Sequence, residues 1–386
     1  MKTKLSFVLW GFVGLAAATA ACTTKTTYID EPVPAEKPGP EGEAPPPDVE
    51  QAPEGSNPLA DLPADWQEKA ASYLDARAGE WLKSPPQVGQ NVNCAMSCHT
   101  TNAYLLARKK LGDVATPNAD AARAKFESRV KEANEGTALP FYGKNTDTKT
   151  KESHATESVL NALALTFDDL EGGGELSAST KAALDRMWAQ QSATGAWAWL
   201  EFGLEPWETR NDWGVAMAAM VAGKIPENTS SAQAAGTAKI KKYVKSSLDS
   251  MVLHDKAATL WASASLKDLL TAEEQNAIAK EVAATQNEDG GFALGKWGQG
   301  ELASEKASSD GYATALATLA LCSTQGGTKR ADVHKGLAWI ATHQAADGSW
   351  PGKSVNSSTA RAKSFMTDAA TSYATLAITT CAPAPK

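Results

Sequence analysis

The chain has 386 residues, a formal net charge of −8 at pH 7 and 21% charged residues. A negative balance without a basic stripe excludes nucleic acid as an expected partner. Beyond the first residues no apolar stretch is long enough to cross a membrane, which excludes a protein with several membrane spans.

The chain opens with Lys2 and Lys4, followed by an apolar stretch over residues 5–18 that ends in small residues. This layout is typical of a secretory signal. Residues 19–22, Thr-Ala-Ala-Cys, resemble the lipobox of bacterial lipoproteins. The resemblance implies that residues 1–21 are a removed signal peptide and that Cys22 is lipidated; cleavage that leaves Cys22 as an incidental thiol is the alternative. We expect an exported lipoprotein that faces the periplasm or the cell surface and contacts the membrane only through its N-terminal lipid.

Residues 22–63 are rich in Pro, Glu, Gly and Ala and have almost no large apolar side chains. Such a segment cannot bury enough surface to offset the entropy lost on ordering. We predict a disordered, extended tether that joins the lipid to a folded body.

Residues 64–150 are predicted to form a helical segment that contains one chemically specific cluster, Cys94, Cys98 and His99. Two cysteines followed at once by His are typical of covalent haem attachment, for which the usual spacing is C-x-x-C-H. Three residues separate the cysteines here, so the cluster is a C-x-x-x-C-H variant. The pattern predicts haem c, with thioether bonds to Cys94 and Cys98 and His99 as the proximal iron ligand.

Two other interpretations of this cluster remain open. A Cys94–Cys98 disulfide would close a very short loop and cannot form if both residues lie in regular helix. Another metal would need further ligands, and no other Cys or His lies nearby in sequence. The remaining cysteines are Cys322 and Cys381, and two cysteines make no visible disulfide framework. Cys322 lies in an apolar helix and is expected to be a small buried thiol.

Residues 151–386 are predicted to contain helices of two alternating kinds. Residues 310–321 are apolar or small nearly all round and should be buried on every side, whereas residues 329–343 combine an apolar face with charged positions. No sustained alternating strand pattern occurs. The expected fold class is all-α, built from stacked helical hairpins.

Three turns between helices share one signature: residues 190–197 (QQSATGAW), 286–292 (QNEDGGF) and 344–350 (QAADGSW). The last turn, with the preceding residues 335–343, resembles the QW motif of the squalene cyclase and prenyltransferase superfamily. The resemblance covers about residues 153–386 and implies an α/α toroid, in which the Gln and Trp connect neighbouring repeats.

The superfamily's known catalytic groups are not recognisable. Only Asp168-Asp169 partly matches the acid motif Asp-x-Asp-Asp. No set of Asp, Cys and His has the spacing of the prenyltransferase zinc site. Fold alone does not establish function, so we expect neither terpene cyclase nor prenyltransferase activity.

A polar ring at one mouth of the toroid is a second candidate site. Asp212, Asp310 and Asp368 each stand at or near the start of a helix of the buried kind, where they could face a central cavity or simply cap the helices. Trp199, Trp207 and Glu208 lie in an aromatic loop that could line the same mouth.

The cluster around His99 followed by the toroid resembles a group of exported bacterial proteins that join a haem-binding motif to a squalene-cyclase-like toroid. The predicted haem favours electron transfer or redox sensing, with the cavity as a site for a redox partner or a small apolar ligand. The alternatives are an enzyme acting in the toroid mouth and a cofactor-free binding or scaffold module with a Cys94–Cys98 disulfide.

Overall fold

The computed structural model describes residues 49–83, 97–112, 117–138, 147–171, 173–298 and 300–382, all within one compact unit, Gly42–Lys386. Four predicted features lie outside the described residues: the signal peptide, the lipidation site Cys22, the tether up to residue 48 and the haem-attachment residue Cys94. No helix within these ranges is long and apolar enough to span a membrane.

The described residues form helices and no strand, so the predicted all-α class is confirmed. The α-helices are α1 (Trp66–Lys83), α2 (Thr101–Ala107), α3 (Pro117–Asn134), α4 (Asp147–Leu170), α5 (Ala178–Gln190), α6 (Asn211–Lys224), α7 (Gln233–Ser247), α8 (Leu253–Ser263), α9 (Ala272–Ala283), α10 (Gly311–Cys322), α11 (Ala331–Thr342) and α12 (Ala360–Cys381).

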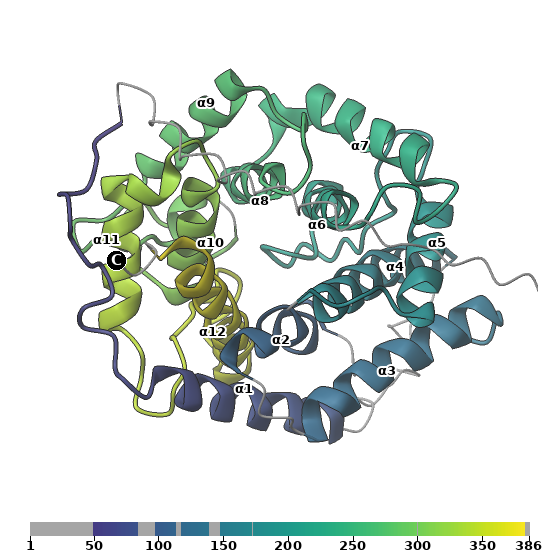
Figure 1. Ribbon diagram of the computed structural model, residues 1–386, viewed down its shortest axis with the longest axis horizontal. Coiled ribbons are helices and arrows are strands. Elements are labelled where there is room, and N and C mark those ends of the chain that lie inside the picture. The colour runs from purple at the N-terminus through teal and green to yellow at the C-terminus, as the bar shows by residue number, and fades with distance from the viewer. Residues whose placement is uncertain are drawn as a thin grey trace, which may run out of the picture. The chain divides into compact units, whose positions relative to one another are not determined.

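The helices form two concentric rings, which confirms the predicted α/α toroid (Figure 1). The even-numbered helices make the inner ring: each contacts the next, and α12 contacts α2, so the ring closes. The odd-numbered helices lie outside them (Figure 1). The sequence pattern explains the division, because α10 is buried all round except at its last residue, whereas α11 buries only one face.

The N-terminal part of this unit is built into the ring. Residues 64–150, expected to precede the toroid, supply α1, α2 and α3, which pack against the other helices. The predicted tether of residues 22–63 is too long at its C-terminal end: the backbone N–H of Ala52 donates to the carbonyl of Lys329, and that of Ala331 donates to the carbonyl of Glu50. Composition could not reveal this contact, because the pairing partner lies far along the chain.

The three related turns connect successive outer helices through one repeated interaction. In each turn the side-chain amide of a glutamine donates to the carbonyl of the glycine four residues later and to a carbonyl near the start of the next outer helix. The glutamines are Gln191, Gln286 and Gln344, and the carbonyls they reach are those of Gly236 in α7, Asp332 in α11 and Trp66 in α1. The last contact joins the end of the outer ring to its beginning.

The turn glycines allow this contact. Gly348 has φ +90°, and a Cβ at this position would lie 2.2 Å from the carbonyl oxygen of Lys69 in α1. The indole ring of Trp350 then packs edge-on against Trp66, with 6.3 Å between ring centroids. A side chain at residue 348 would push α1 away from this turn.

The expectation that Cys322 is a reduced buried thiol is wrong, because Cys322 and Cys381 form a disulfide with 5.8 Å between their Cα atoms. The two residues are 59 positions apart, and only the packing of α10 against α12 places them together. The bond links the C-terminal ends of two neighbouring inner helices.

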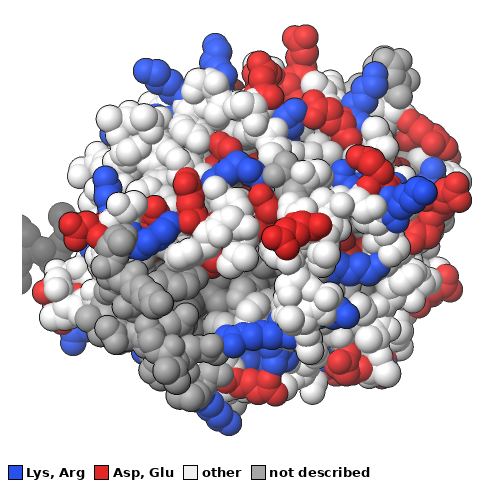
Figure 2. Space-filling model, turned by 180° about the vertical axis from the view of Figure 1, so that it is seen from behind, with Lys and Arg blue, Asp and Glu red and all other residues white. Residues whose placement is uncertain are grey.

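Charges on the visible outer face are mixed. Figure 2 shows acidic and basic side chains interspersed, without a large area of one sign.

We predict that Gly348→Ala lowers the free energy of unfolding more than Gly203→Ala does. Both glycines have positive φ, but no atom lies within 4 Å of a Cβ at residue 203. The backbone penalty of about 1–2 kcal/mol is therefore common to both, and the clash with α1 adds about 1–3 kcal/mol at residue 348 alone. Urea denaturation measures both variants, and equal losses would contradict the ring-closing role of this turn.

Candidate functional site

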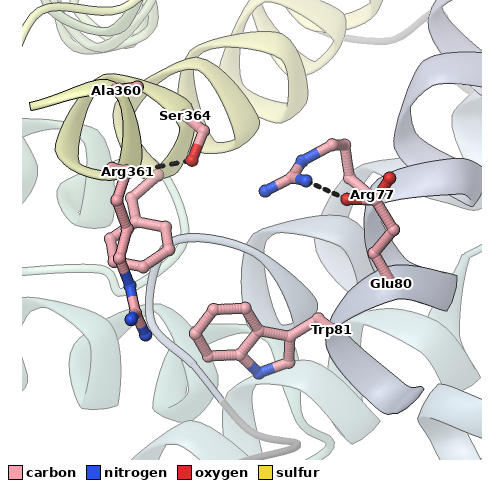
Figure 3. A pocket seen from close by; sticks show the side chains of 7 residues that line it. Arg77, Glu80, Trp81, Ala360, Arg361 and Ser364 are labelled. Carbon is pink, nitrogen blue, oxygen red and sulfur yellow. Dashed lines mark hydrogen bonds and ion pairs between the residues drawn. The ribbon is translucent and has the colours of Figure 1, made fainter. Parts of the chain in front are cut away.

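A cavity of about 500 Å³ lies between α1 and the first turns of α12 (Figure 3). Its lining combines two aromatic rings with charged groups. The lining residues are Arg77, Glu80, Trp81, Ala360, Arg361, Ser364 and Phe365. Such a mixture of flat apolar walls and a few charged groups is typical of a site for a polar organic ligand.

His99 lies against the aromatic side of this cavity. Its imidazole stacks on the ring of Phe365 with 4.0 Å between centroids and 15° between planes, and Trp81 meets it edge-on at 5.1 Å. The turn before α2 sets its place, because the Ser97 hydroxyl accepts the backbone N–H groups of Thr100 and Thr101. His99 therefore stands on a rigid turn.

A hydrogen-bonded chain orients the imidazole. The hydroxyl of Thr100 donates to Oδ2 of Asp368 at 2.7 Å, and Nδ1 of His99 lies 2.8 Å from the same hydroxyl oxygen. A threonine hydroxyl has one proton, and this proton points to Asp368, so the network assigns the His99 proton to Nδ1. Nε2 of His99 is then the nitrogen with the free lone pair.

Asp368 is the centre of this network. Its side chain is 1% exposed and also accepts from the Tyr73 hydroxyl at 2.9 Å and from Nε and Nη2 of Arg77 at 2.7 and 3.1 Å. Burial, with Asp368 adding to it, raises the pKa of Tyr73 well above its usual value. The hydrogen bond to Asp368 raises the pKa of Arg77. Four donors thus hold one buried carboxylate.

The imidazole of His99 is partly exposed but lies deep among other side chains. This desolvation, together with the positive charges of Arg77 and Arg361, lowers the pKa of His99 to about 3. His99 is therefore neutral at physiological pH, and Nε2 can accept a proton or a hydrogen bond.

A second network lies behind the first. The ring of Trp207 is 6.1 Å from that of His99, and its indole N–H donates to the Tyr312 hydroxyl at 3.0 Å. This hydroxyl lies 2.9 Å from Nε2 of His254, whose Nδ1 is 2.8 Å from Asp255. All these side chains are buried, and burial raises the pKa of Tyr312 well above its usual value.

Sequence reasoning did not single out the His254-Asp255 pair. The adjacent residues open a buried helix and could have been noticed for that reason. Their partner Tyr312 begins another inner helix, α10, and no sequence pattern connects the two.

The three predicted aspartates have different roles. Asp310 caps α10 by accepting the N–H of Ala313, and it also accepts the N–H of Leu294 in the preceding turn; burial raises its pKa to about 6. Asp212 accepts from the Tyr243 hydroxyl of α7. Only Asp368 belongs to the network beside the cavity, so the predicted polar ring of three carboxylates is not brought together there.

The predicted aromatic loop is mostly structural. Trp199 is 1% exposed, donates to the carbonyl of Trp207 and packs over Gly214 of α6. Glu208 is half-buried, and its backbone bonds with that of Leu204. Trp207 alone of the three reaches the ring of His99.

Comparison with known proteins found no matching family model and no matching curated protein. Similar solved structures include a glycosidase (14% identity, TM-score 0.48, covering 83% of this chain and 100% of that one) and a glycosidase in complex with glucose (13%, 0.47, 83% and 100%). A polysaccharide lyase is similar at 12% identity and a TM-score of 0.49, covering 82% of this chain and 97% of that one. At these values the likeness concerns the fold.

The predicted main function, electron transfer or redox sensing by a cytochrome c-like haem protein, is corrected: the similar solved structures bear the names of glycosidases and a polysaccharide lyase. Within the described ranges no three His, Cys, Asp or Glu side chains gather as a metal site. His99, expected to be an iron ligand, stacks on Phe365, which lines the cavity.

We predict that His99 makes the stability of the protein depend on pH. The unfolded chain binds a proton on His99 near pH 6.5, whereas the folded chain binds it only near pH 3. The stability contributed by the neutral imidazole is thus complete above the unfolded pKa and is lost as the pH falls toward the folded pKa.

The free energy of unfolding should therefore fall more steeply below pH 6.5 for the wild type than for His99→Gln. Urea denaturation of both proteins over a series of pH values measures the difference. Parallel curves would show that His99 titrates alike in both states.

Proposed function

We propose that the protein is an exported enzyme that performs acid–base chemistry on a saccharide in the cavity between α1 and α12, with His99 as the general base. The observation that carries this proposal is the chain from Asp368 through Thr100 to Nδ1 of His99, which leaves Nε2 with its lone pair. A base needs such a second group to hold its tautomer and direction.

The network also keeps the ring oriented during proton transfer. When Nε2 takes a proton from a substrate or from water, Nδ1 keeps its hydrogen bond to Thr100, whose hydroxyl is held by Asp368. Arg77 and Tyr73 hold Asp368 in place, so little reorganisation is needed at that moment.

The lining of the cavity favours a saccharide as substrate. The flat rings of Trp81 and Phe365 offer apolar surfaces on which the C–H faces of a sugar can pack. Arg77, Glu80 and Arg361 supply charged hydrogen-bonding groups for hydroxyls. A purely apolar ligand would take these charged groups out of water without offering them a hydrogen bond.

We predict that His99→Gln lowers the turnover of the best substrate at least about 100-fold, because it removes the general base. Purified protein is incubated with a panel of neutral and acidic polysaccharides. New reducing ends detect cleavage, and ultraviolet absorbance of unsaturated sugars separates elimination from hydrolysis.

Thr100→Val should also lower turnover, because Nδ1 loses the acceptor that orients it, whereas Thr100→Ser keeps the hydroxyl and should restore activity. Lys363→Gln, an exposed position on α12, is the matched control and should resemble the wild type. If His99→Gln cleaves the substrate as fast as the wild type, His99 is not the base.

Export is the second part of the proposal. The Cys322–Cys381 disulfide supports it, because such bonds persist in oxidising compartments. The signal-like N-terminus and the lipobox-like residues before Cys22 agree with this location.

We predict that the protein made in a bacterial host is recovered in the membrane fraction with Cys322 and Cys381 joined. Thiol alkylation before and after reduction, followed by mass spectrometry, detects the bond. Cys22→Ser should release the protein from the membrane while the disulfide remains. Free thiols at both positions in wild-type protein would contradict export.

A further inference from the structure

Arg361 differs from the other guanidinium group of the cavity. Arg77 is engaged with two carboxylates, those of Asp368 and Glu80. Arg361 is exposed and lies over the ring of Phe365 at 5.4 Å, and no carboxylate of the described residues forms an ion pair with it. Within the described residues, Arg361 is therefore the guanidinium of the cavity that can still pair with an anion.

The position of Arg361 adds to the charge of its guanidinium. It lies in the first turn of α12, a 22-residue helix whose positive dipole end faces the same side of the cavity. Figure 3 shows the side chain reaching down from α12 beside the aromatic rings, opposite Arg77 and Glu80 of α1. An anionic group placed there would meet the guanidinium and the helix end together.

We infer that the saccharide bound in this cavity carries an anionic group, a carboxylate or a sulfate, and that Arg361 binds this group while the sugar ring packs on Phe365 and Trp81. This inference rests on the proposed function and names the substrate class of the same site. Arg361 thereby acts as a specificity-determining residue.

The experiment measures binding alone, by calorimetry with the otherwise full-length His99→Gln protein, so that no probe is consumed. The probes are a galacturonic acid trisaccharide, a carrageenan tetrasaccharide, which has sulfates and no carboxylate, and neutral cellotriose. At least one anionic probe should bind about tenfold or more tightly than cellotriose, which is the effect of one charge-assisted contact. The anionic probe that binds more tightly shows whether the site prefers a carboxylate or a sulfate.

Adding Arg361→Gln should remove this preference, because it weakens the binding of the anionic probe about tenfold more than that of cellotriose, whereas adding Lys363→Gln should preserve it. Circular dichroism confirms that each variant is folded. If neither anionic probe binds more tightly than cellotriose, or if Arg361→Gln keeps the preference, the inference is wrong.

The two proposals can fail separately. Arg361-dependent binding of an anionic probe together with no cleavage of any polysaccharide would sustain the anionic site and refute the catalytic role. If cleavage requires His99 but anionic and neutral probes bind equally well, the catalytic role is sustained and the anionic site is refuted.

Discussion

Closure of the helical ring is the constraint on which the candidate site depends. Tyr73, Arg77 and Thr100 come from the first part of the toroid, and they meet Asp368 of α12 across 295, 291 and 268 positions of sequence. They meet because α12 packs against α1 and α2 and because the amide of Gln344 bonds to the carbonyl of Trp66. The cavity lies at this seam between the two ends of the toroid (Figures 1 and 3).

The buried carboxylate at the seam is costly for stability alone. Moving a carboxylate and a guanidinium out of water carries a penalty that even good pairing barely offsets, and apolar side chains of similar volume often stabilise as well. Asp368 nevertheless receives four hydrogen bonds, one of which fixes Thr100 and through it the tautomer of His99. Because these hydrogen bonds together orient one imidazole, chemistry at His99 explains the network better than stability does.

The candidate site was only partly predictable from sequence. His99 drew attention because two cysteines precede it, and Asp368 because it opens a buried helix, but nothing in the sequence connected the two. The structure places Phe365 and Trp81 beside His99, and no local pattern around residue 99 predicts these neighbours. The cavity itself has no signature, since its walls come from helices at opposite ends of the chain.

The sequence by itself determined the helical class, the alternation of buried and half-buried helices and the three glutamine-glycine turns. These features depend on residues a few positions apart, whose periodicity and turn chemistry act locally. Only the tertiary structure decided that Asp368 meets Thr100, that Tyr312 meets His254 and that Cys322 meets Cys381. These pairings depend on which helices become neighbours when the ring closes, and no local pattern encodes that choice.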